Sequence, residues 1–363
     1  MYLEKLKELV QEGVTDKAFP GATYAIVLPD AIYTDFVGDK SWYPNVEPNT
    51  IDTIYDMASV TKVMTTTTCI LKLLEFGKVR LFSKVSNFLP RFKHQNIVLW
   101  HLLTHTSGLR EGLPGVTKIK SREEAWDKAY DMELIYEPGT KIQYSDVNYI
   151  LLGKIIEVVS GLSLDEFAKK YIYEPCEMKD TCFNPKDIKR CAPTEERNDE
   201  IVQGIVRGHV HDEAAYILGG VAGHAGMFST ANDVANFIQM ILNKGVFKNK
   251  RVLSDQIVDL LYKPQVAQQI GVSLIPQRRG IGWIVNDYNS NAGDLVSDET
   301  ITHTGFTGTN VWIDRINKVG FCLLSNRVHP TRANLKHMEL RPKVANYIMA
   351  HLEEIKKEIQ NGN

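Results

Sequence analysis

The chain has 363 residues, of which 44% are hydrophobic and 24% are charged. The 42 Lys and Arg residues nearly balance the 44 Asp and Glu residues, which leaves a net charge of −2. These values are typical of a globular protein of about two domains. They disfavour nucleic-acid binding, which needs an excess of positive charge. No apolar run in the sequence reaches the roughly 18 residues of a membrane-spanning helix.

The cysteines and the first residues favour a cytoplasmic protein. The five cysteines are odd in number and form no C-x-x-C pair, as expected of free thiols in a reducing compartment. The segment MYLEKLKELVQEGV is charged and amphipathic, without the basic, apolar and small-residue order of a signal peptide. We therefore expect a cytoplasmic location, or a secreted one if the natural N-terminus is longer. The sequence indicates no oligomeric state.

The N-terminal part predicts two helices with strands between them. Leu3 and Leu6 fall on one face of the first helix, and Pro20-Gly21 ends that pattern. Gly77 is the stop signal of the second helix. In chain order we expect a helix over 2–16, strands over 22–28, 32–37 and 53–55, and a helix from 59 to about 76.

The middle of the chain, from about 78 to 200, has helical periodicity interrupted by Pro and Gly. Farther on, Gly219–Gly226 is too rich in glycine for a regular element, which predicts a loop whose backbone approaches another group closely. The helices expected in the middle are 100–105, 125–131, 149–160 and 164–171.

The C-terminal part returns to strands. Since strands flank a helical middle, we expect an α/β fold of the α+β type, with an antiparallel sheet flanked by helices. We expect residues 1–77 and 205–363 to form this core and residues 78–204 to form an all-helical insert. The expected C-terminal elements are helices over about 231–243 and 340–358 and strands over 282–285, 300–304, 309–313 and 320–325.

Ser59-Val60-Thr61-Lys62 forms an S-x-x-K tetrad at the start of a predicted helix. Positions i and i+3 share a helix face, so the Lys62 amine can reach the Ser59 hydroxyl. A serine becomes a nucleophile when a base removes its proton, and desolvation lowers the pKa of a lysine towards that task. Alone, the tetrad fits a capping serine and a solvated lysine better.

A tyrosine motif follows in the middle segment. Tyr144-Ser145-Asp146 precedes a predicted helix, at a place where the tyrosine hydroxyl can relay protons between a nucleophile and a leaving group. The plainer interpretation is a loop tyrosine beside an aspartate that caps the helix.

A third motif lies among the C-terminal strands. His303-Thr304-Gly305 ends a predicted strand just before Phe306. The edge of a strand beside a nucleophile can donate a backbone N–H to an oxyanion. The plainer interpretation is a strand end with glycine in the turn.

The order of these motifs, Ser-x-x-Lys, Tyr-x-Asp and His-Thr-Gly, resembles the serine β-lactamase and penicillin-binding-protein superfamily, specifically its class C-like branch. Residues 101–109 (HLLTHTSGL) and the run 138–157 resemble the same superfamily. The resemblance extends from about residue 15 to 350. It implies a β-lactamase/transpeptidase-like fold with the active site between the core and the insert.

The resemblance implies a role for each motif residue. Ser59 would be the acylated nucleophile, Lys62 its general base, and Tyr144 would share the proton transfer. The backbone N–H groups of Ser59 and Phe306 would form the oxyanion hole. The other positions of the active-site motifs are Asp146, His303, Thr304 and Gly305.

Two of these residues depart from the usual pattern of the superfamily. His303 stands where many members have lysine, and histidine is mostly neutral near pH 7, so a permanent cation for a substrate carboxylate is lost there. Asp146 replaces the usual asparagine and exchanges a donor amide for an acceptor-only carboxylate. Both changes are common in esterase and amidase-like members, which disfavours strong β-lactamase activity.

The segments 208–214 and 326–332 resemble members that act on peptidoglycan fragments, including exo-acting N-acetylmuramoyl-L-alanine amidases. Arginines there can bind a substrate carboxylate through a bidentate fork, although an arginine is as often a solvated surface charge. Polar side chains there can meet sugar hydroxyls. The candidate substrate-binding residues are Arg207, Arg327 and Arg332 for the carboxylate, and His211, Asp212 and His224 for the sugar.

The histidine pairs do not indicate a metal. His209 and His211 alternate without a third ligand at a useful spacing, and His101 and His105 lack the Glu of H-E-x-x-H. We therefore expect neither a metal nor another cofactor.

We expect a serine hydrolase that forms an acyl-enzyme on a small-molecule amide or ester, preferably a muramyl peptide in peptidoglycan-fragment recycling. The alternatives are a carboxylesterase or a D-aminopeptidase, followed by a β-lactamase and a non-catalytic penicillin-binding sensor. An α/β-hydrolase is disfavoured because no serine lies in a G-x-S-x-G context.

Overall fold

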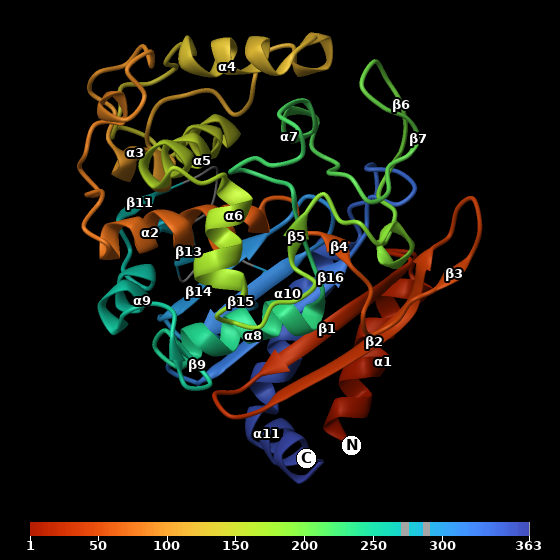
Figure 1. Ribbon diagram of the computed structural model, residues 1–363. Coiled ribbons are helices and arrows are strands. Elements are labelled where there is room, and N and C mark those ends of the chain that lie inside the picture. The colour runs from red at the N-terminus through yellow and green to blue at the C-terminus, as the bar shows by residue number, and fades with distance from the viewer. Residues whose placement is uncertain (270–275, 286–290, 363) are drawn as a thin grey trace.

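A nine-stranded antiparallel sheet forms the centre of the fold. The computed structural model describes residues 1–269, 276–285 and 291–362 (Figure 1). In spatial order the strands are β11 (Val266–Gln268), β12 (Gln277–Arg279), β13 (Ile284–Val285), β14 (Thr300–Thr304), β15 (Asn310–Asp314), β16 (Val319–Ser325), β1 (Gly21–Val27), β2 (Ile32–Ser41) and β3 (Glu47–Pro48).

The two ends of the chain meet in this sheet. β1 pairs antiparallel with β16, where Ala22 lies opposite Ser325, and β14, β15 and β16 form the expected meander. Every residue of β1 and β16 is buried because helices cover both faces. The antiparallel sheet flanked by helices is therefore confirmed, and β14 has the bounds predicted for it.

The helices surround the sheet. Among the described residues, no single helix combines the length and hydropathy of a membrane span; only Asp146–Ser160 and Leu164–Tyr173, counted together across a 74° bend, meet both criteria. The α-helices are α1 (Tyr2–Thr15), α2 (Thr68–Glu75), α3 (Leu99–Leu103), α4 (Arg122–Tyr130), α5 (Asp146–Ser160), α6 (Leu164–Ala168), α7 (Glu213–Ile217), α8 (Ala231–Leu242), α9 (Asp255–Leu261), α10 (His337–Ala350) and α11 (Leu352–Asn361).

Different helices cover the two faces. On one face, α1, α10 and α11 form a core with the sheet that includes Leu6, Trp312 and Val344. On the other face, α8 lies against β1 and β16, and a Cβ at Gly320 would come within 2.3 Å of Ile238. The N- and C-termini lie together at the bottom of Figure 1, and α3, α4 and α5 lie at the top.

Shorter elements complete the fold. Two helical turns are π-helical, η1 (Lys62–Thr67) and η4 (Lys169–Tyr173). The 3₁₀ turns are η2 (Val85–Asn87), η3 (Val116–Lys118) and η5 (Ile188–Arg190). The small sheets pair β4 (Tyr55–Asp56) and β5 (Cys182–Phe183) with β8 (Met227–Ser229), β6 (Glu196–Asn198) with β7 (Gln203–Ile205), and β9 (Val246–Phe247) with β10 (Lys250–Arg251).

Four predicted elements differ from the structure. The helix predicted over 59–76 begins as π-helical η1 before α2 continues it, and the helix predicted over 164–171 is α6 followed by π-helical η4. The single C-terminal helix predicted over 340–358 is two helices, because His351 leaves helical geometry (φ −121°, ψ 26°) and its ring packs on Tyr2 and Tyr347. The middle segment, expected to be all-helical, also contributes β5 and β6.

Candidate active site

Ser59 lies in a turn between β4 and η1 that is fixed by a buried carboxylate. Ala58 has φ +46°, a left-handed conformation that non-glycine residues rarely adopt. Its N–H donates to Asp56 Oδ1 at 2.8 Å, and the N–H of His211 donates to Asp56 Oδ2 at 2.7 Å. Burial raises the pKa of Asp56, against the lowering effect of these two N–H groups. The turn thus presents the Ser59 side chain on a rigid support.

Lys62 lies one helical turn beyond the serine and is buried. Its Nζ donates to Ser59 Oγ at 2.9 Å and to the carbonyl of His224 at 2.9 Å, and it lies 2.8 Å from Asp146 Oδ1. Burial lowers the pKa of Lys62, but the negative charge of Asp146 and the hydroxyl of Tyr144 outweigh it and raise the pKa. The expectation of a lowered lysine pKa is therefore wrong, because sequence spacing did not show Asp146 beside it.

Tyr144 is held by ring stacking. Its ring lies 4.5 Å from that of His105 at an interplanar angle of 28°, and Lys62 Nζ lies 5.0 Å from the Tyr144 ring centre. His105 is fully buried, and its Nδ1 accepts a hydrogen bond from the N–H of Ser145 at 3.0 Å. His105 therefore positions the tyrosine. Sequence reasoning took this histidine as structural, but did not identify Tyr144 as the residue that it holds.

The end of β14 is fastened to the Ser59 turn. Thr307 Oγ1 donates to the carbonyl of Asp56 at 2.7 Å, and Thr309 Oγ1 donates to the carbonyl of Met57 at 3.1 Å. A Cβ at Gly305 would lie 2.5 Å from that same Met57 carbonyl, so only glycine fits there. The close contact brings the backbone after β14 against the turn that carries Ser59.

Two backbone N–H groups at this contact, those of Ser59 and Phe306, donate to no backbone carbonyl among the described residues. Both residues border one cavity. These donors are the feature an oxyanion hole needs, which fits the role predicted for them.

His303 lies at the end of β14 and is neutral. Its Nδ1 donates to the carbonyl of Thr304 at 2.9 Å, which leaves Nε2 as an acceptor without a partner among the described residues. Burial, together with the charges of Arg279 and Lys62, lowers the pKa of His303 to about 3. As expected, this position supplies no permanent cation.

A cavity of about 320 Å³ opens beside Ser59. Among the described residues that line it there is no Asp or Glu, whereas three arginines contribute to its wall. Sequence reasoning predicted only one of the three, since Arg279 and Arg341 lie in no motif. The lining residues are Ser59, Tyr144, Arg279, Ile284, Asn291, His303, Thr304, Gly305, Phe306, Arg327, Leu335, His337, Met338 and Arg341.

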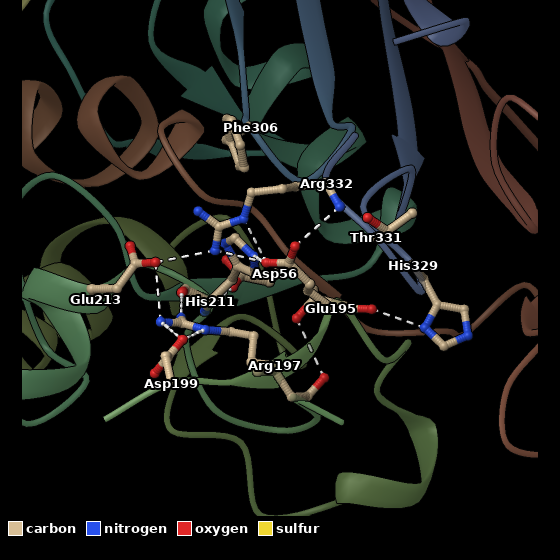
Figure 2. A network of polar contacts seen from close by, with 12 residues as sticks. Asp56, Glu195, Arg197, Asp199, His211, Glu213, Phe306, His329, Thr331 and Arg332 are labelled. Carbon is tan, nitrogen blue, oxygen red and sulfur yellow. Dashed lines mark hydrogen bonds and ion pairs between the residues drawn. The ribbon is translucent and has the colours of Figure 1, made fainter. Parts of the chain in front are cut away.

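Of the three arginines predicted to bind substrate, only Arg327 lines this cavity. Its Nε donates to the carbonyl of Phe306 at 2.8 Å, and its guanidinium lies 4.4 Å from the Phe306 ring centre. Arg332 instead forms ion pairs with Glu195 at 2.6 Å and Glu213 at 3.1 Å (Figure 2). Arg332 thus lies behind the cavity wall, near the ring of Phe306.

Arg207 is placed elsewhere and does not line the cavity. Both terminal nitrogens donate to Glu47, at 2.6 and 2.8 Å, and Nε donates to the carbonyl of Cys191 at 2.9 Å. The prediction that Arg207 binds a substrate carboxylate is corrected, because a carboxylate of the chain already occupies its fork.

His211, Asp212 and His224 support the site from behind. The His211 ring stacks on Phe306 at 5.6 Å and contacts Glu195 Oε2 at 3.0 Å (Figure 2). Asp212 Oδ1 lies 2.7 Å from His224 Nε2, while the His224 carbonyl holds Lys62. None of the three borders the cavity, so the prediction that they meet sugar hydroxyls is replaced by a supporting role.

The histidine pair at 209 and 211 is separated by its contacts. The His209 ring packs on Tyr216 at 5.2 Å, whereas His211 faces Glu195. Within the described ranges, no three His, Cys, Asp or Glu side chains gather as a metal site would require.

Comparisons with known proteins show the family from the sequence and the fold from solved structures. A family model described as Beta-lactamase matches residues 6–345. An N-acetylmuramyl-L-alanine amidase of Bacillus subtilis (strain 168) is 31% identical over 90% of this chain and 81% of its own. The solved structure of EstCE1, "a hydrolase with promiscuous acyltransferase activity", has a TM-score of 0.78 at 18% identity over 96% of this chain and 98% of its own. The octameric penicillin-binding protein homologue of Pyrococcus abyssi has a TM-score of 0.75 at 23% identity over 97% of this chain and 77% of its own.

Proposed function

The chain belongs to the β-lactamase family, and from this premise we propose that it cleaves the lactyl amide between N-acetylmuramic acid and the stem peptide of a muramyl peptide. The family makes the chain a serine hydrolase. The observation that carries the choice of substrate is the 31% identity with an N-acetylmuramyl-L-alanine amidase across 90% of the chain. A cavity whose charged side chains are arginines suits a substrate with peptide carboxylates.

The reaction proceeds through an acyl-enzyme. Ser59 Oγ bonds to the lactyl carbonyl carbon while its proton passes into the group formed by Tyr144, Lys62 and Asp146. The N–H groups of Ser59 and Phe306 hold the oxyanion. The C–N bond then breaks, and the leaving amine takes the proton. Water repeats the sequence on the acyl-enzyme and releases the muramic acid carboxylate.

The charge of Lys62 determines which step of the proton transfer this residue performs. In the resting enzyme Asp146 keeps Lys62 protonated at neutral pH. Lys62 Nζ therefore passes one proton to Asp146 Oδ1, 2.8 Å away, as it takes the proton of Ser59 Oγ at 2.9 Å. The ammonium that results stabilises the negative charge that develops on Ser59 Oγ.

The test is incubation with N-acetylmuramoyl-L-Ala-D-Glu and detection of free sugar and free dipeptide by mass spectrometry. We expect both products from the wild type and neither from Ser59→Ala. Intact substrate together with rapid hydrolysis of p-nitrophenyl esters would instead identify a carboxylesterase. Rapid opening of a chromogenic cephalosporin would identify a β-lactamase, and a fluorescent penicillin held for hours on Ser59 would identify a sensor.

We also propose that the enzyme acts in the cytoplasm. All five cysteines are free thiols, as is usual in a reducing compartment. Fractionation of the source cells tests this proposal: we expect the protein with cytoplasmic markers, and its recovery outside the cytoplasmic membrane would contradict the proposal.

A further inference from the structure

The two N–H groups predicted to form the oxyanion hole are held in different ways. The N–H of Ser59 follows a turn that Asp56 fixes, whereas the N–H of Phe306 lies in the loop after β14. Thr307 ties the next residue of that loop to the carbonyl of Asp56 at 2.7 Å, but Phe306 itself is 48% exposed. An oxyanion hole needs both donors at about 2.7 to 3.1 Å from one point. The position of Phe306 relative to the Ser59 turn therefore has to be fixed by further contacts.

His211 contacts both parts of this arrangement. Its backbone N–H donates at 2.7 Å to Asp56 Oδ2, the second oxygen of the carboxylate that fixes the Ser59 turn. Its ring centre lies 5.6 Å from that of Phe306 at an interplanar angle of 27°, so the two rings are stacked (Figure 2). His211 is itself buried. One buried residue thus joins the turn of Ser59 to the side chain of Phe306.

Glu195 fixes the orientation of the His211 ring. Burial raises the pKa of Glu195, but its hydrogen bonds with His211 and Arg332 outweigh burial and lower the pKa to about 2. The carboxylate is therefore ionised at neutral pH and can only accept, so His211 Nε2 carries a proton and donates to Glu195 Oε2 at 3.0 Å. Arg332 donates to the same carboxylate through Nε at 2.7 Å and through its backbone N–H at 3.1 Å. A charge-assisted hydrogen bond of this kind holds the ring in one orientation.

Arg197 fixes the backbone of His211. Its Nη1 donates to the His211 carbonyl at 2.9 Å, and its Nη2 lies 2.6 Å from Asp199 and 3.0 Å from Glu213 (Figure 2). Glu213 also pairs with Arg332 at 3.1 Å. Because these charges are paired with one another, the network supports His211 instead of presenting a free charge to a ligand.

We propose that His211 is a positioning residue of the oxyanion hole: its ring, held by Glu195, keeps the N–H of Phe306 where it and the N–H of Ser59 meet the same oxyanion. This inference rests on the proposed function only for Ser59 as the nucleophile and for these two N–H donors. His211 is not among the described residues that line the cavity, so it acts on the reaction through Phe306. Since the oxyanion forms only in the transition state, loss of this positioning lowers kcat and leaves KM nearly unchanged.

The experiment separates the ring of His211 from its hydrogen bond. His211→Gln loses the ring but keeps an amide that can donate to Glu195, whereas His211→Phe keeps a ring and loses the donor. Both variants keep the backbone N–H that bonds to Asp56. The control is His209→Gln, which removes a half-buried histidine that packs on Tyr216 instead of Phe306.

Two measurements are made on each protein, together with its thermal unfolding temperature. Hydrolysis of p-nitrophenyl butyrate gives kcat and KM. Calorimetric titration with n-butylboronic acid gives the affinity for a tetrahedral adduct, in which boron takes Ser59 Oγ as its fourth ligand and the serine proton passes to the neighbouring base. Because one boron-bound oxygen then lies in the oxyanion hole, this affinity reports on the two N–H donors independently of ester turnover.

We expect kcat of His211→Gln to fall at least about tenfold with KM within about twofold of the wild type, since loss of one oxyanion donor costs about 10²- to 10³-fold. The boronate affinity should fall by a similar factor. His211→Phe should recover most of kcat, and His209→Gln should match the wild type. If His211→Gln does not fold, the same comparison is made with Glu195→Gln, which keeps the ring but weakens its hydrogen bond and should lower kcat severalfold at unchanged KM.

Unchanged kcat and boronate affinity in the variant without the ring overturn the proposal. Equal losses in His211→Gln and His211→Phe also overturn it, because they would assign the effect to the fold around α7. A wild type that binds no boronate does the same, since the two N–H groups then form no oxyanion hole. If the variants follow the expected order while muramyl peptide stays intact, the positioning role stands and the amidase proposal fails.

Discussion

The two sides of the cavity differ in whether a buried cation has a carboxylate partner within the chain. On the Ser59 wall, the ammonium of Lys62 has the Asp146 carboxylate at 2.8 Å. On the α10 wall, Arg341 has only neutral oxygens at 3.2 Å, and its Nε has no partner among the described residues. Both cations are almost fully buried.

This difference separates two tasks. A charge that is paired within the chain has a fixed position before substrate arrives, which suits the role that we propose for Lys62 at Ser59 Oγ, 2.9 Å away. A buried charge without a partner in the chain can form its ion pair with a ligand, so that the ion pair contributes to ligand binding. We therefore expect substitutions on the Ser59 wall to reduce both stability and rate, and substitutions on the α10 wall to change substrate preference.

The largest effect is expected from Ser59→Ala, which removes the covalent route. Turnover of every substrate should fall by at least about 10³-fold, while the thermal unfolding temperature stays near that of the wild type because the Ser59 turn is fixed by Asp56. Rate measurements on purified protein check the first part, and calorimetry checks the second. Hydrolysis at the parental rate would remove Ser59 from the mechanism.

Asp146→Asn tests the paired wall. The change leaves a buried ammonium without its carboxylate, so the free energy of unfolding should fall by about 3 to 5 kcal/mol. The pKa of Lys62 should also fall, because the charge that most strongly opposes the effect of burial is then removed, and the limb of the pH–rate profile governed by Lys62 should move to lower pH. Urea denaturation and pH–rate profiles measure the two effects.

A matched control is Asp127→Asn, which breaks the exposed ion pair with Arg91. Exposed pairs contribute about 0 to 1 kcal/mol, so this variant should stay close to the wild type. If Asp146→Asn were equally mild, the ion pair would not hold Lys62 in place.

Glu195 is a paired buried charge of the opposite sign, in the group of polar contacts behind Phe306. His211 and Arg332 lower the pKa of Glu195 to about 2, against the effect of burial, from an ordinary value of 4.5. A lowered acid pKa contributes stability above pH 4.5 that is lost as pH falls towards 2, here about 3 kcal/mol. The stability difference between wild type and Glu195→Gln should therefore shrink across that pH window.

Urea denaturation between pH 2 and 6 measures this difference, with the exposed Glu354→Gln as control. A difference that stays constant with pH would show that Glu195 contributes through packing alone.

The smallest effect is expected from Arg341→Gln on stability. Because the guanidinium has no counter-charge among the described residues, its loss removes a desolvation cost together with two weak hydrogen bonds. The unfolding temperature should stay within a few degrees of the wild type or rise, unlike that of Asp146→Asn. Differential scanning calorimetry decides it, and a fall as large as in Asp146→Asn would show that Arg341 is structural.

The sequence predicts the elements and local motifs of this site well. Strand 300–304 has the predicted bounds, because the residue types that form a strand and end it in a turn are neighbours in the sequence. The approach of Lys62 to Ser59 follows from one helical turn. Both features depend on residues that are close in the sequence, so the pattern of residue types predicts them.

Features made by distant parts of the chain could not be predicted in this way. The pKa of Lys62 is raised by Asp146, which follows a different loop, so its sign was predicted wrongly. Arg341 reaches the cavity from a C-terminal helix without a motif. Arg207 was predicted to bind a substrate carboxylate, but Glu47 of β3 already pairs with its guanidinium. Lys62 and Arg207 are decided by an opposite charge that the fold brings near, and Arg341 by the helix that carries it to the cavity.

The π-helical turn η1 makes the position of Lys62 depend on the number of residues in this segment. Three successive threonines in it each meet a different partner: Thr65 bonds to Tyr173 at 2.5 Å, Thr66 to the carbonyl of Gly223 at 2.6 Å, and Thr67 to Tyr149 at 3.2 Å. Deleting one residue here would favour an ordinary α-helix, but would rotate the segment before it by about 100°. Lys62 would then turn away from Asp146, so this stretch tolerates substitution more readily than a change in its number of residues.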